Sequence, residues 1–368
     1  MRKIYLDNAA TTAMHLDVLK AMTPYFLKEY GNPSSPHALG ENALKAMNDA
    51  RRKLALEIGA KPWEFVFTSG GTEANTLALQ GLAVANPGKK KIIISAIEHS
   101  SVREVVLFLK RWGYEIVEIP VNHEGFLDLR ALEDSLDKNT LVTSVIHGHN
   151  EIGVLQDIEK IATICRRKDV FFHTDAVQSF GKVGIDVSDG VDLLSASAHK
   201  IGGPKGIGFL YVRDGVALQP LIMGGGQEKG RRGGTENVPG IVGFAKALEI
   251  TKKSDWKKVR KMRNYFIIEL EKLGGKIIGP SDQRLDCHVA MVMPCDSELL
   301  VLALSKKSIY CSTRSACLDR QHQESKALEA LGLPRKEMQG FVRFVLPPGI
   351  TLGDLKIVIR EISGFLRK

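Results

Sequence analysis

The chain contains few cysteines and few aromatic residues. Five cysteines stand at irregular spacing among 368 residues, and aromatic side chains make up 7% of the total. An odd number of cysteines in a chain of this length is not typical of a secreted disulfide framework, and the nearest pairs lack the Cys-x-x-Cys spacing of a structural zinc site. We therefore expect no metal site, structural thiols buried at Cys165, Cys287 and Cys295, and a chemical role for at least one other cysteine.

Long apolar runs are also absent. No stretch approaches the roughly 18 apolar residues that a membrane-spanning helix needs, and the first residues form no hydrophobic signal core. A composition of 44% hydrophobic and 25% charged residues is that of a globular protein, and the length suffices for a large core and a second, smaller domain. These features favour a cytoplasmic protein without membrane contact.

The formal net charge of +9 is modest for this length, but part of it is concentrated in one expected helix. The cations are Lys252, Lys253, Lys257, Lys258, Arg260, Lys261 and Arg263. Such a stretch can bind an acidic protein or an RNA, but it is more often the solvated face of a helix whose other side is apolar. Apolar residues recur here at helical spacing, at Trp256, Val259, Met262, Phe266 and Leu270. We favour the solvated face and expect no direct binding of nucleic acid.

Short runs rich in β-branched residues alternate with helical patterns in the first two thirds of the chain. The expected strands are residues 65–67, 92–94, 116–119, 141–145, 170–172 and 208–212, and residues 156–168 have the spacing of a connecting helix. This alternation predicts the α/β class, with a mainly parallel sheet covered by helices. We expect a large domain at residues 15–253 and a small domain formed by residues 1–14 and 254–368.

Two strand ends carry side chains of complementary chemistry. Asp175 follows the run at 170–172, and Lys200 lies just beyond an apolar run at 191–194. Ligands bind at the carboxyl ends of strands in open α/β sheets. Pyridoxal 5′-phosphate needs a carboxylate that keeps its ring nitrogen protonated and a lysine that holds its aldehyde as a Schiff base. Taken alone, Asp175 could be a helix cap and Lys200 a solvated surface lysine, but the two together predict a site for this cofactor.

Two further segments are expected at the same edge of the sheet. The strand at 65–67 leads through Gly70, Gly71 and Thr72 into a helical pattern, and free N–H groups at a helix start bind phosphate. His99 follows the run at 92–94, where an imidazole can stack on a cofactor ring or move protons. Glycine turns and loop histidines are common, so these two segments indicate a cofactor site only in combination with Asp175 and Lys200.

Motifs occur along nearly the whole chain, at residues 5–12, 31–35 with 37, 68–75, 98–99, 150–154, 173–178, 197–200, 231–237 and 315–317. Together they resemble the cysteine desulfurases of the class V aminotransferase group, in particular the NifS/IscS-like branch. The resemblance implies a fold-type I pyridoxal phosphate-dependent transferase. Its large domain would carry the cofactor on a mainly parallel sheet, and its smaller α+β domain would carry a catalytic cysteine loop. It also implies a homodimer.

The resemblance implies roles for single residues. Lys200 would hold the cofactor aldehyde, and Asp175 would pair with the pyridinium nitrogen. The other expected cofactor contacts are Gln178 at the ring hydroxyl, His99 against the ring, Gly71, Thr72, Ser197 and His199 at the phosphate, and Thr235 from the second subunit. His99 would also transfer protons.

The implied substrate is L-cysteine. Asn150 and Arg343 would hold its carboxylate, for which a planar guanidinium is well suited. Cys317 would attack the substrate sulfur as a thiolate, leaving alanine and a persulfide, and the polar segment 319–325 would carry the sulfur outward. The expected acceptor is an iron–sulfur scaffold or a tRNA-thiolation carrier.

Two alternatives stay open at this point. A selenocysteine lyase or an aminotransferase of the same group would use the same cofactor, but an aminotransferase has no use for Cys317. The chain departs from the family pattern at Glu41, His149 and Arg314. A degenerate member would bind a partner without turnover, an alternative motivated by Glu41 and by the altered surroundings of Cys317. Dependence on Cys317 and the presence of bound cofactor distinguish these cases.

Overall fold

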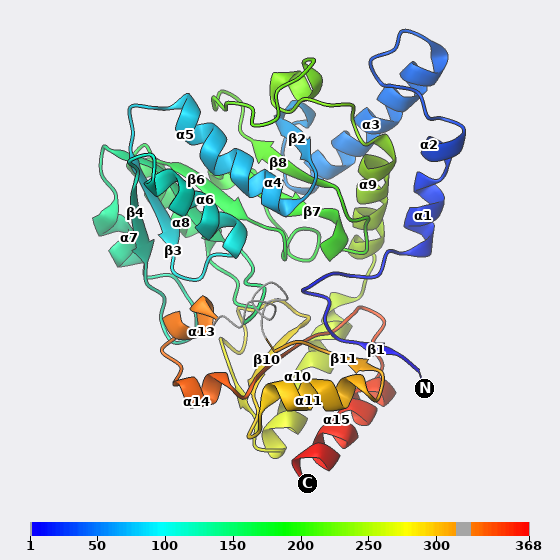
Figure 1. Ribbon diagram of the computed structural model, residues 1–368, viewed down its shortest axis with the longest axis vertical. Coiled ribbons are helices and arrows are strands. Elements are labelled where there is room, and N and C mark those ends of the chain that lie inside the picture. The colour runs from blue at the N-terminus through cyan, green and yellow to red at the C-terminus, as the bar shows by residue number, and fades with distance from the viewer. Residues whose placement is uncertain (1, 314–324, 368) are drawn as a thin grey trace.

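The computed structural model describes residues 2–313 and 325–367. The chain forms a large lobe around one sheet and a small lobe around another, stacked along the long axis of the molecule (Figure 1). Cys317 and Arg314 lie outside the described residues, as does most of the polar segment 319–325.

The large lobe is built on a seven-stranded sheet. Its strands are β2 (Phe65–Thr68), β3 (Lys91–Ser95), β4 (Glu115–Ile119), β5 (Thr140–Ile146), β6 (Phe171–Asp175), β7 (Leu193–Ser197) and β8 (Gly208–Val212). In the order β2-β8-β7-β6-β5-β3-β4, β8 is antiparallel to both neighbours and all other pairs are parallel. The expected mainly parallel sheet is confirmed. Every residue of β3 and β5 is buried, as parallel strands covered on both faces require.

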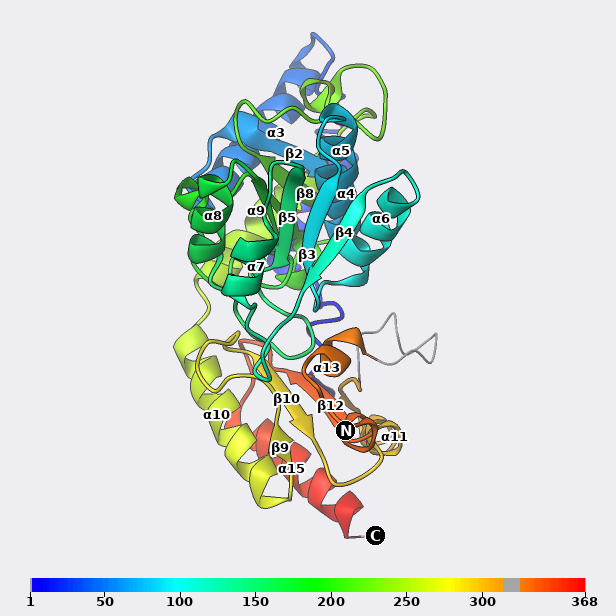
Figure 2. The same ribbon diagram turned by 90° about the vertical axis from the view of Figure 1, so that its left-hand side faces the viewer.

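Helices cover both faces of this sheet, as Figure 2 shows edge-on. Those of the large lobe are α1 (Leu16–Met22), α2 (Pro24–Leu27), α3 (Ala38–Glu57), α4 (Gly71–Thr76), α5 (Leu82–Ala85), α6 (Ser100–Lys110), α7 (Leu129–Ser135), α8 (Ile158–Arg167) and α9 (Val238–Lys252). One core contains apolar side chains of α3, α8 and α9, and a separate core on the other face contains those of α4 and α6. A π turn at Leu77–Gly81 joins α4 to α5, so the helix that starts at Gly71 continues to Ala85.

The small lobe combines the C-terminal part of the chain with its first residues. Strands β9 (Lys276–Ile277), β10 (His288–Val292) and β12 (Phe341–Val345) form an antiparallel sheet, and β1 (Ile4–Tyr5) pairs in parallel with β11 (Ile309–Tyr310). Its helices are α10 (Trp256–Lys272), α11 (Ser297–Ser305), α13 (Lys326–Ala330), α14 (Arg335–Met338) and α15 (Leu352–Leu366). Ile4, Leu6 and Ala9 belong to the apolar core of this lobe. The exact domain boundaries stay a prediction, which this packing supports.

Two expectations about single residues were wrong. Arg263 is not part of the solvated face of α10, because it falls between Val259 and Phe266 on the buried face and donates to the carbonyl oxygen of Leu285. Cys295 is partly exposed because it lies in the turn between β10 and α11. In the part of the chain that the structure describes, no helix is long and apolar enough to span a membrane.

Candidate active site

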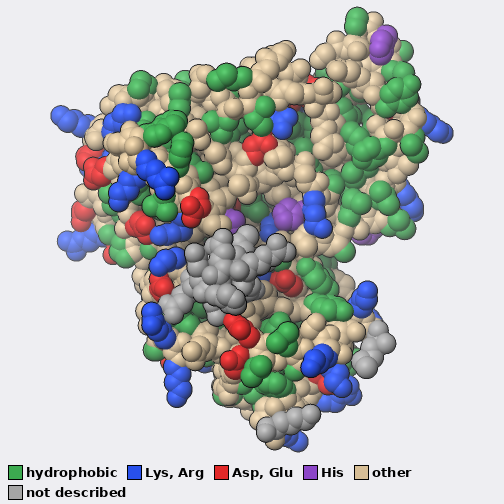
Figure 3. Space-filling view, in the orientation of Figure 1, with side chains coloured by type: hydrophobic (Ala, Val, Ile, Leu, Met, Phe, Trp, Pro, Cys, Tyr) green, Lys and Arg blue, Asp and Glu red, His purple; other side chains and the backbone are tan. Residues whose placement is uncertain are grey.

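A cavity of about 220 Å³ lies between the carboxyl edge of the large sheet and the N-terminal segment of the small lobe. Histidine side chains are visible at this junction in Figure 3. Ten of the expected site residues line the cavity: Gly71, Thr72, His99, Asn150, Asp175, Gln178, Ser197, His199, Lys200 and Arg343. Thr235 does not line it; this residue is exposed and lines a neighbouring cavity. Cys317 lies outside the described residues.

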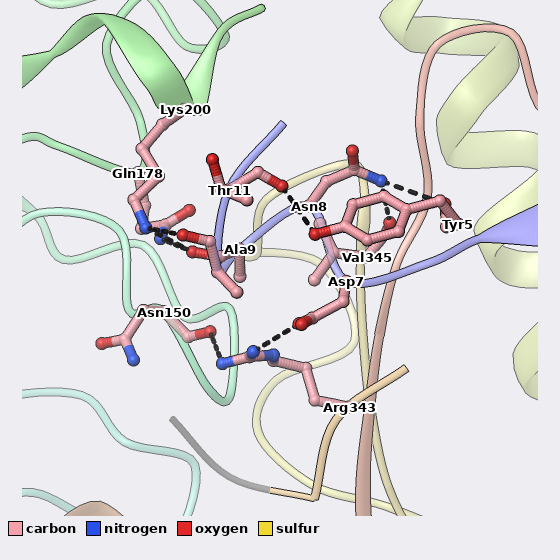
Figure 4. A network of polar contacts seen from close by, with 11 residues as sticks. Tyr5, Asp7, Asn8, Ala9, Thr11, Asn150, Gln178, Lys200, Arg343 and Val345 are labelled. Atoms are coloured by element: carbon pink, nitrogen blue, oxygen red, sulfur yellow. Dashed lines mark hydrogen bonds and ion pairs between the residues drawn. The ribbon is translucent and has the colours of Figure 1, made fainter. Parts of the chain in front are cut away.

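Lys200 ends the 3₁₀ turn η4 (Ala198–Lys200), directly after β7. Its Nζ donates to the carbonyl oxygens of Ala9 and Ala10, at 2.5 and 2.8 Å (Figure 4). Burial, followed by the charges of Arg343 and Lys182, lowers the pKa of Lys200 to about 7. A substantial fraction of neutral amine is therefore present near neutral pH, which is the form that condenses with an aldehyde.

Asp175 is the last residue of β6 and is buried. Its Oδ2 accepts from Asn75 Nδ2 at 2.8 Å, and its Oδ1 accepts from the backbone N–H of Val177 at 2.9 Å. Each carboxylate oxygen can accept more than one hydrogen bond, so capacity remains for a pyridinium N–H in the cavity.

A chain of hydrogen bonds links Asp175 to His99. Asn75 Nδ2 donates to Asp175 Oδ2 and also to Ser101 Oγ, both at 2.8 Å. The Ser101 hydroxyl can therefore donate to His99 Nδ1, at 2.8 Å, and the backbone N–H of Ser101 also points to Nδ1, at 3.2 Å. Because Nδ1 accepts, the neutral imidazole carries its proton on Nε2. Burial lowers the pKa of His99 against the opposing effect of Asp175, which favours this neutral form.

Arg343 reaches the cavity from β12 of the small lobe. Its two terminal nitrogens donate to Asp7 Oδ1 at 2.7 Å and to the carbonyl oxygen of Asn150 at 3.1 Å. Its Nε is buried and has no partner among the described residues. A fixed guanidinium with unused N–H groups is suited to a carboxylate ligand.

The part of the cavity at the start of α4 is suited to a phosphate. Gly71 begins α4, and a Cβ added there would lie 2.6 Å from Cγ2 of Val177, so the close approach of the two segments requires glycine. Thr72 follows in the same first turn, where N–H groups are free. Ser197 and His199 line the same cavity, and burial lowers the pKa of His199 to about 4.

The residues present fit pyridoxal phosphate. The cavity contains an amine with a lowered pKa, a buried carboxylate and a helix start suited to an anion. In addition, Gln178 donates from Nε2 to the carbonyl oxygen of Ala9 at 2.9 Å, whereas its Oε1 is buried and has no partner among the described residues. That oxygen is an acceptor available to a ring hydroxyl.

Sequence reasoning missed the supporting residues Asp7, Asn75 and Ser101. Each lies within or next to a motif that carried the family resemblance, but no spacing along the chain indicates that Asn75 meets Ser101 or that Asp7 meets Arg343. His149, a departure from the family pattern, is buried with a pKa lowered to about 3 by desolvation. Its Nδ1 accepts from the backbone N–H groups of residues 151 and 152, so it fixes this loop.

Comparison with known proteins gives the family. The model of the family described as Aminotransferase class-V matches residues 4–354. This chain belongs to that family. A protein from Dictyoglomus turgidum named cysteine desulfurase IscS is 40% identical over all of this chain and 95% of its own length. A solved NifS-like protein is 36% identical, with a TM-score of 0.94 and complete coverage of both chains. The structure described as SspA in complex with cysteine is also 36% identical, with a TM-score of 0.86 over 94% of this chain and 99% of its own.

Membership in the class V aminotransferases confirms three sequence-based expectations. The chain has the fold-type I architecture, it is an enzyme, and the cofactor of its family is pyridoxal 5′-phosphate. The roles of the individual residues remain predictions, to which the geometry of the cavity gives physical support.

Proposed function

We propose that this chain is a pyridoxal phosphate-dependent cysteine desulfurase, which converts L-cysteine to L-alanine and transfers the sulfur to an acceptor. The observation that carries this proposal is a single cavity that combines Lys200, Asp175 and Arg343, an amine, an acid and a carboxylate-binding cation. Full-length relatives named cysteine desulfurase and a neighbour described in complex with cysteine support the choice of substrate.

Bound pyridoxal phosphate supplies an electron sink that stabilises negative charge at the α-carbon of the substrate. Lys200 would hold its aldehyde, and Asp175 would keep its ring nitrogen protonated. The start of α4 with Thr72, Ser197 and His199 would bind the phosphate.

Two residues of the cavity are suited to moving protons. The neutral amine of Lys200 would accept the α-proton, since its lowered pKa leaves it partly unprotonated near pH 7. His99 would present its Nε2–H to the cofactor ring and the substrate, because Nδ1 is occupied by Ser101.

Cys317 would be the nucleophile, a role that rests on the sequence resemblance. Its thiolate would attack the substrate sulfur, and the Cβ–S bond would break with its electron pair left on carbon. Protonation of that carbon gives alanine, while the sulfur remains on Cys317 as a persulfide. The β-carbon gains two electrons, while the substrate sulfur and the Cys317 sulfur each lose one in forming the persulfide bond, so the step needs no external oxidant.

We also propose a homodimer in the cytoplasm, with an iron–sulfur scaffold or a tRNA-thiolation carrier as the acceptor. Large apolar side chains are exposed on and beside α1 and α2, including Leu16 at 61%, Phe26 at 56% and Leu27 at 69%. Hydrophobic atoms gather over this part of the surface in Figure 3. A second copy of the chain would cover them, and exposed Thr235 would then be free to reach the phosphate site of the partner.

The proposal is tested by assaying alanine and sulfide from L-cysteine in the presence of a thiol reductant. Equal amounts of both products are expected from the wild-type protein, with loss of both in Cys317→Ala although the absorbance of bound cofactor is retained. Unchanged formation of alanine and sulfide in Cys317→Ala would reject Cys317 as the nucleophile. Turnover with selenocysteine but little with cysteine would argue for a selenocysteine lyase.

A further inference from the structure

The buried guanidinium of Arg343 has one carboxylate partner in the described part of the chain, Asp7. Asp7 Oδ1 accepts from Arg343 NH2 at 2.7 Å, with the Arg343 side chain 1% exposed and the Asp7 side chain 19% exposed. The two residues are 336 positions apart, and Asp7 lies on the N-terminal segment that runs between the two lobes (Figure 4). A guanidinium buried to this degree is costly unless it is paired and hydrogen-bonded, so the carboxylate of Asp7 balances a charge that the site needs.

The contacts of Arg343 also fix the plane of its guanidinium. NH2 is held by Asp7, and NH1 is held by the carbonyl oxygen of Asn150 at 3.1 Å. The backbone of Arg343 exchanges hydrogen bonds with Ser312, at 2.7 and 3.2 Å. Arginine has five N–H donors, so these contacts leave several for a ligand, including the buried Nε that has no partner among the described residues.

We propose that Asp7 is a positioning residue for recognition of the substrate carboxylate. It acts through Arg343, which it holds in one orientation and whose charge it balances before the substrate binds. The inference rests on the proposed function, since it takes an α-amino acid as the ligand of Arg343.

The carboxylate of Asp7 is not what holds the N-terminal segment in place. Backbone hydrogen bonds join residues 4 and 6 to residues 308 and 310 at 2.9 and 2.7 Å, and Asn8 Nδ2 donates to the carbonyl oxygen of Val345 at 2.7 Å. The Tyr5 hydroxyl donates to the carbonyl oxygen of Thr11 at 3.0 Å. These contacts remain when the carboxylate is removed, so variants of Asp7 are expected to fold and to bind the cofactor.

The test is a double-mutant cycle on the cofactor-loaded protein. Asp7→Ala and Asp7→Asn are each made in the wild type and in Arg343→Ala, with Asp134→Asn on the exposed surface of α7 as a matched control. The affinity for L-alanine is measured by calorimetry, and KM and kcat are measured with L-cysteine. Melting temperature and cofactor absorbance report whether each variant is folded and loaded.

In the wild-type background, Asp7→Ala should raise the Kd of L-alanine and the KM of L-cysteine about tenfold or more, with little change in kcat, because a charge-assisted hydrogen bond that orients Arg343 is lost. Asp7→Asn should have a smaller effect, since the amide oxygen can still accept from Arg343. In the Arg343→Ala background, neither substitution should change the Kd further.

Equal effects of Asp7→Ala in both backgrounds would overturn the inference, as would an unchanged Kd for L-alanine in the wild-type background. The proposed function is judged separately, by the formation of alanine and sulfide from L-cysteine in the unmodified protein. If no alanine and sulfide form, but the effect of Asp7→Ala on the Kd of L-alanine still depends on Arg343, the proposed reaction is rejected and the role of Asp7 is retained. If alanine and sulfide form normally, but the effect of Asp7→Ala on the Kd of L-alanine does not depend on Arg343, only the role of Asp7 is rejected.

Discussion

At Lys200, opposing influences act on one amine. Two backbone carbonyl oxygens accept hydrogen bonds from Nζ, which favours the ammonium form, whereas burial and the charges of Arg343 and Lys182 favour the neutral amine. Burial and the two positive charges outweigh the hydrogen bonds, so the pKa of Lys200 is about 7 in place of 10.5. The neutral form is present in increasing proportion as the pH rises through 7.

This balance predicts how cofactor loading depends on pH. The rate at which cofactor-free protein takes up pyridoxal phosphate should rise as the pH approaches about 7 and level off above it, because only the neutral amine attacks the aldehyde. The measurement is stopped-flow absorbance of the cofactor across this range. A rate that is still rising steeply near the ordinary lysine pKa of 10.5 would contradict the lowered pKa.

Ser101→Ala tests the hydrogen-bond chain between Asp175 and His99. The substitution removes the hydroxyl that donates to His99 Nδ1 and leaves one amide hydrogen of Asn75 without its acceptor. We expect kcat to fall about tenfold, a part of the roughly 10²–10⁴-fold that a positioned proton-transfer group contributes, with a smaller change in cofactor affinity. Nitrogen chemical shifts of His99 should show a mixture of tautomers.

Ser100→Ala is the matched control, since Ser100 precedes Ser101 in the same helix but does not line the cavity. It should leave both kcat and the nitrogen shifts unchanged. If Ser101→Ala behaved like this control, Ser101 would have no part in fixing the tautomer of His99.

At the scale of elements, the start of α4 and the segment after β6 come so close that a side chain at Gly71 would collide with Val177. Gly71→Ala should therefore displace the segment that follows Asp175 and reduce the affinity for pyridoxal phosphate about tenfold or more, since both the phosphate and the ring contacts shift. Equilibrium titration of the cofactor checks this. In Gly88→Ala the added methyl group meets no atom within 4 Å, so its affinity should equal that of the wild type. Equal affinities in both variants would show that α4 does not form the phosphate site.

The elements themselves could largely be predicted from the sequence. Apolar runs, β-branched in β3 and β5 and largely aromatic in β6, identify these strands, and the rule that ligands bind at carboxyl strand ends brings Asp175, Lys200 and His99 to one edge. Contacts between distant segments could not be predicted in this way. The carbonyl oxygens that hold Lys200 belong to the first ten residues, and backbone groups of this kind leave no signal in the sequence.

The burial of two arginines also could not be predicted from the local sequence. Arg263 and Arg343 look like solvent-exposed residues when they are judged by residue type, because arginine is rarely buried without partners. Both are buried in the structure because tertiary contacts supply acceptors, the carbonyl oxygen of Leu285 for one and Asp7 for the other. The family resemblance, and not the local pattern, singled out Arg343.

At the scale of the whole molecule, the apolar surface around α2 predicts a homodimer. Leu27→Asp should place a charge in the interface, since Leu27 is 69% exposed in the single chain, and should shift the protein toward a monomer. Sedimentation velocity measures this shift. Leu299→Asp, at a leucine that is 58% exposed on α11, is the control and should remain dimeric. A wild-type protein that sediments as a monomer would contradict the homodimer.

Transfer of the substrate sulfur to Cys317 is measured by mass spectrometry of the cofactor-loaded protein after brief exposure to L-cysteine without reductant. We expect one added sulfur atom on the peptide that contains Cys317. Lys200→Ala should abolish this addition, and Cys311→Ala should not, because burial and the charge of Asp7 raise the pKa of the Cys311 thiol and keep it protonated. Formation of alanine with no added sulfur on Cys317, or added sulfur that persists without Lys200, would contradict a cofactor-dependent transfer of sulfur to Cys317.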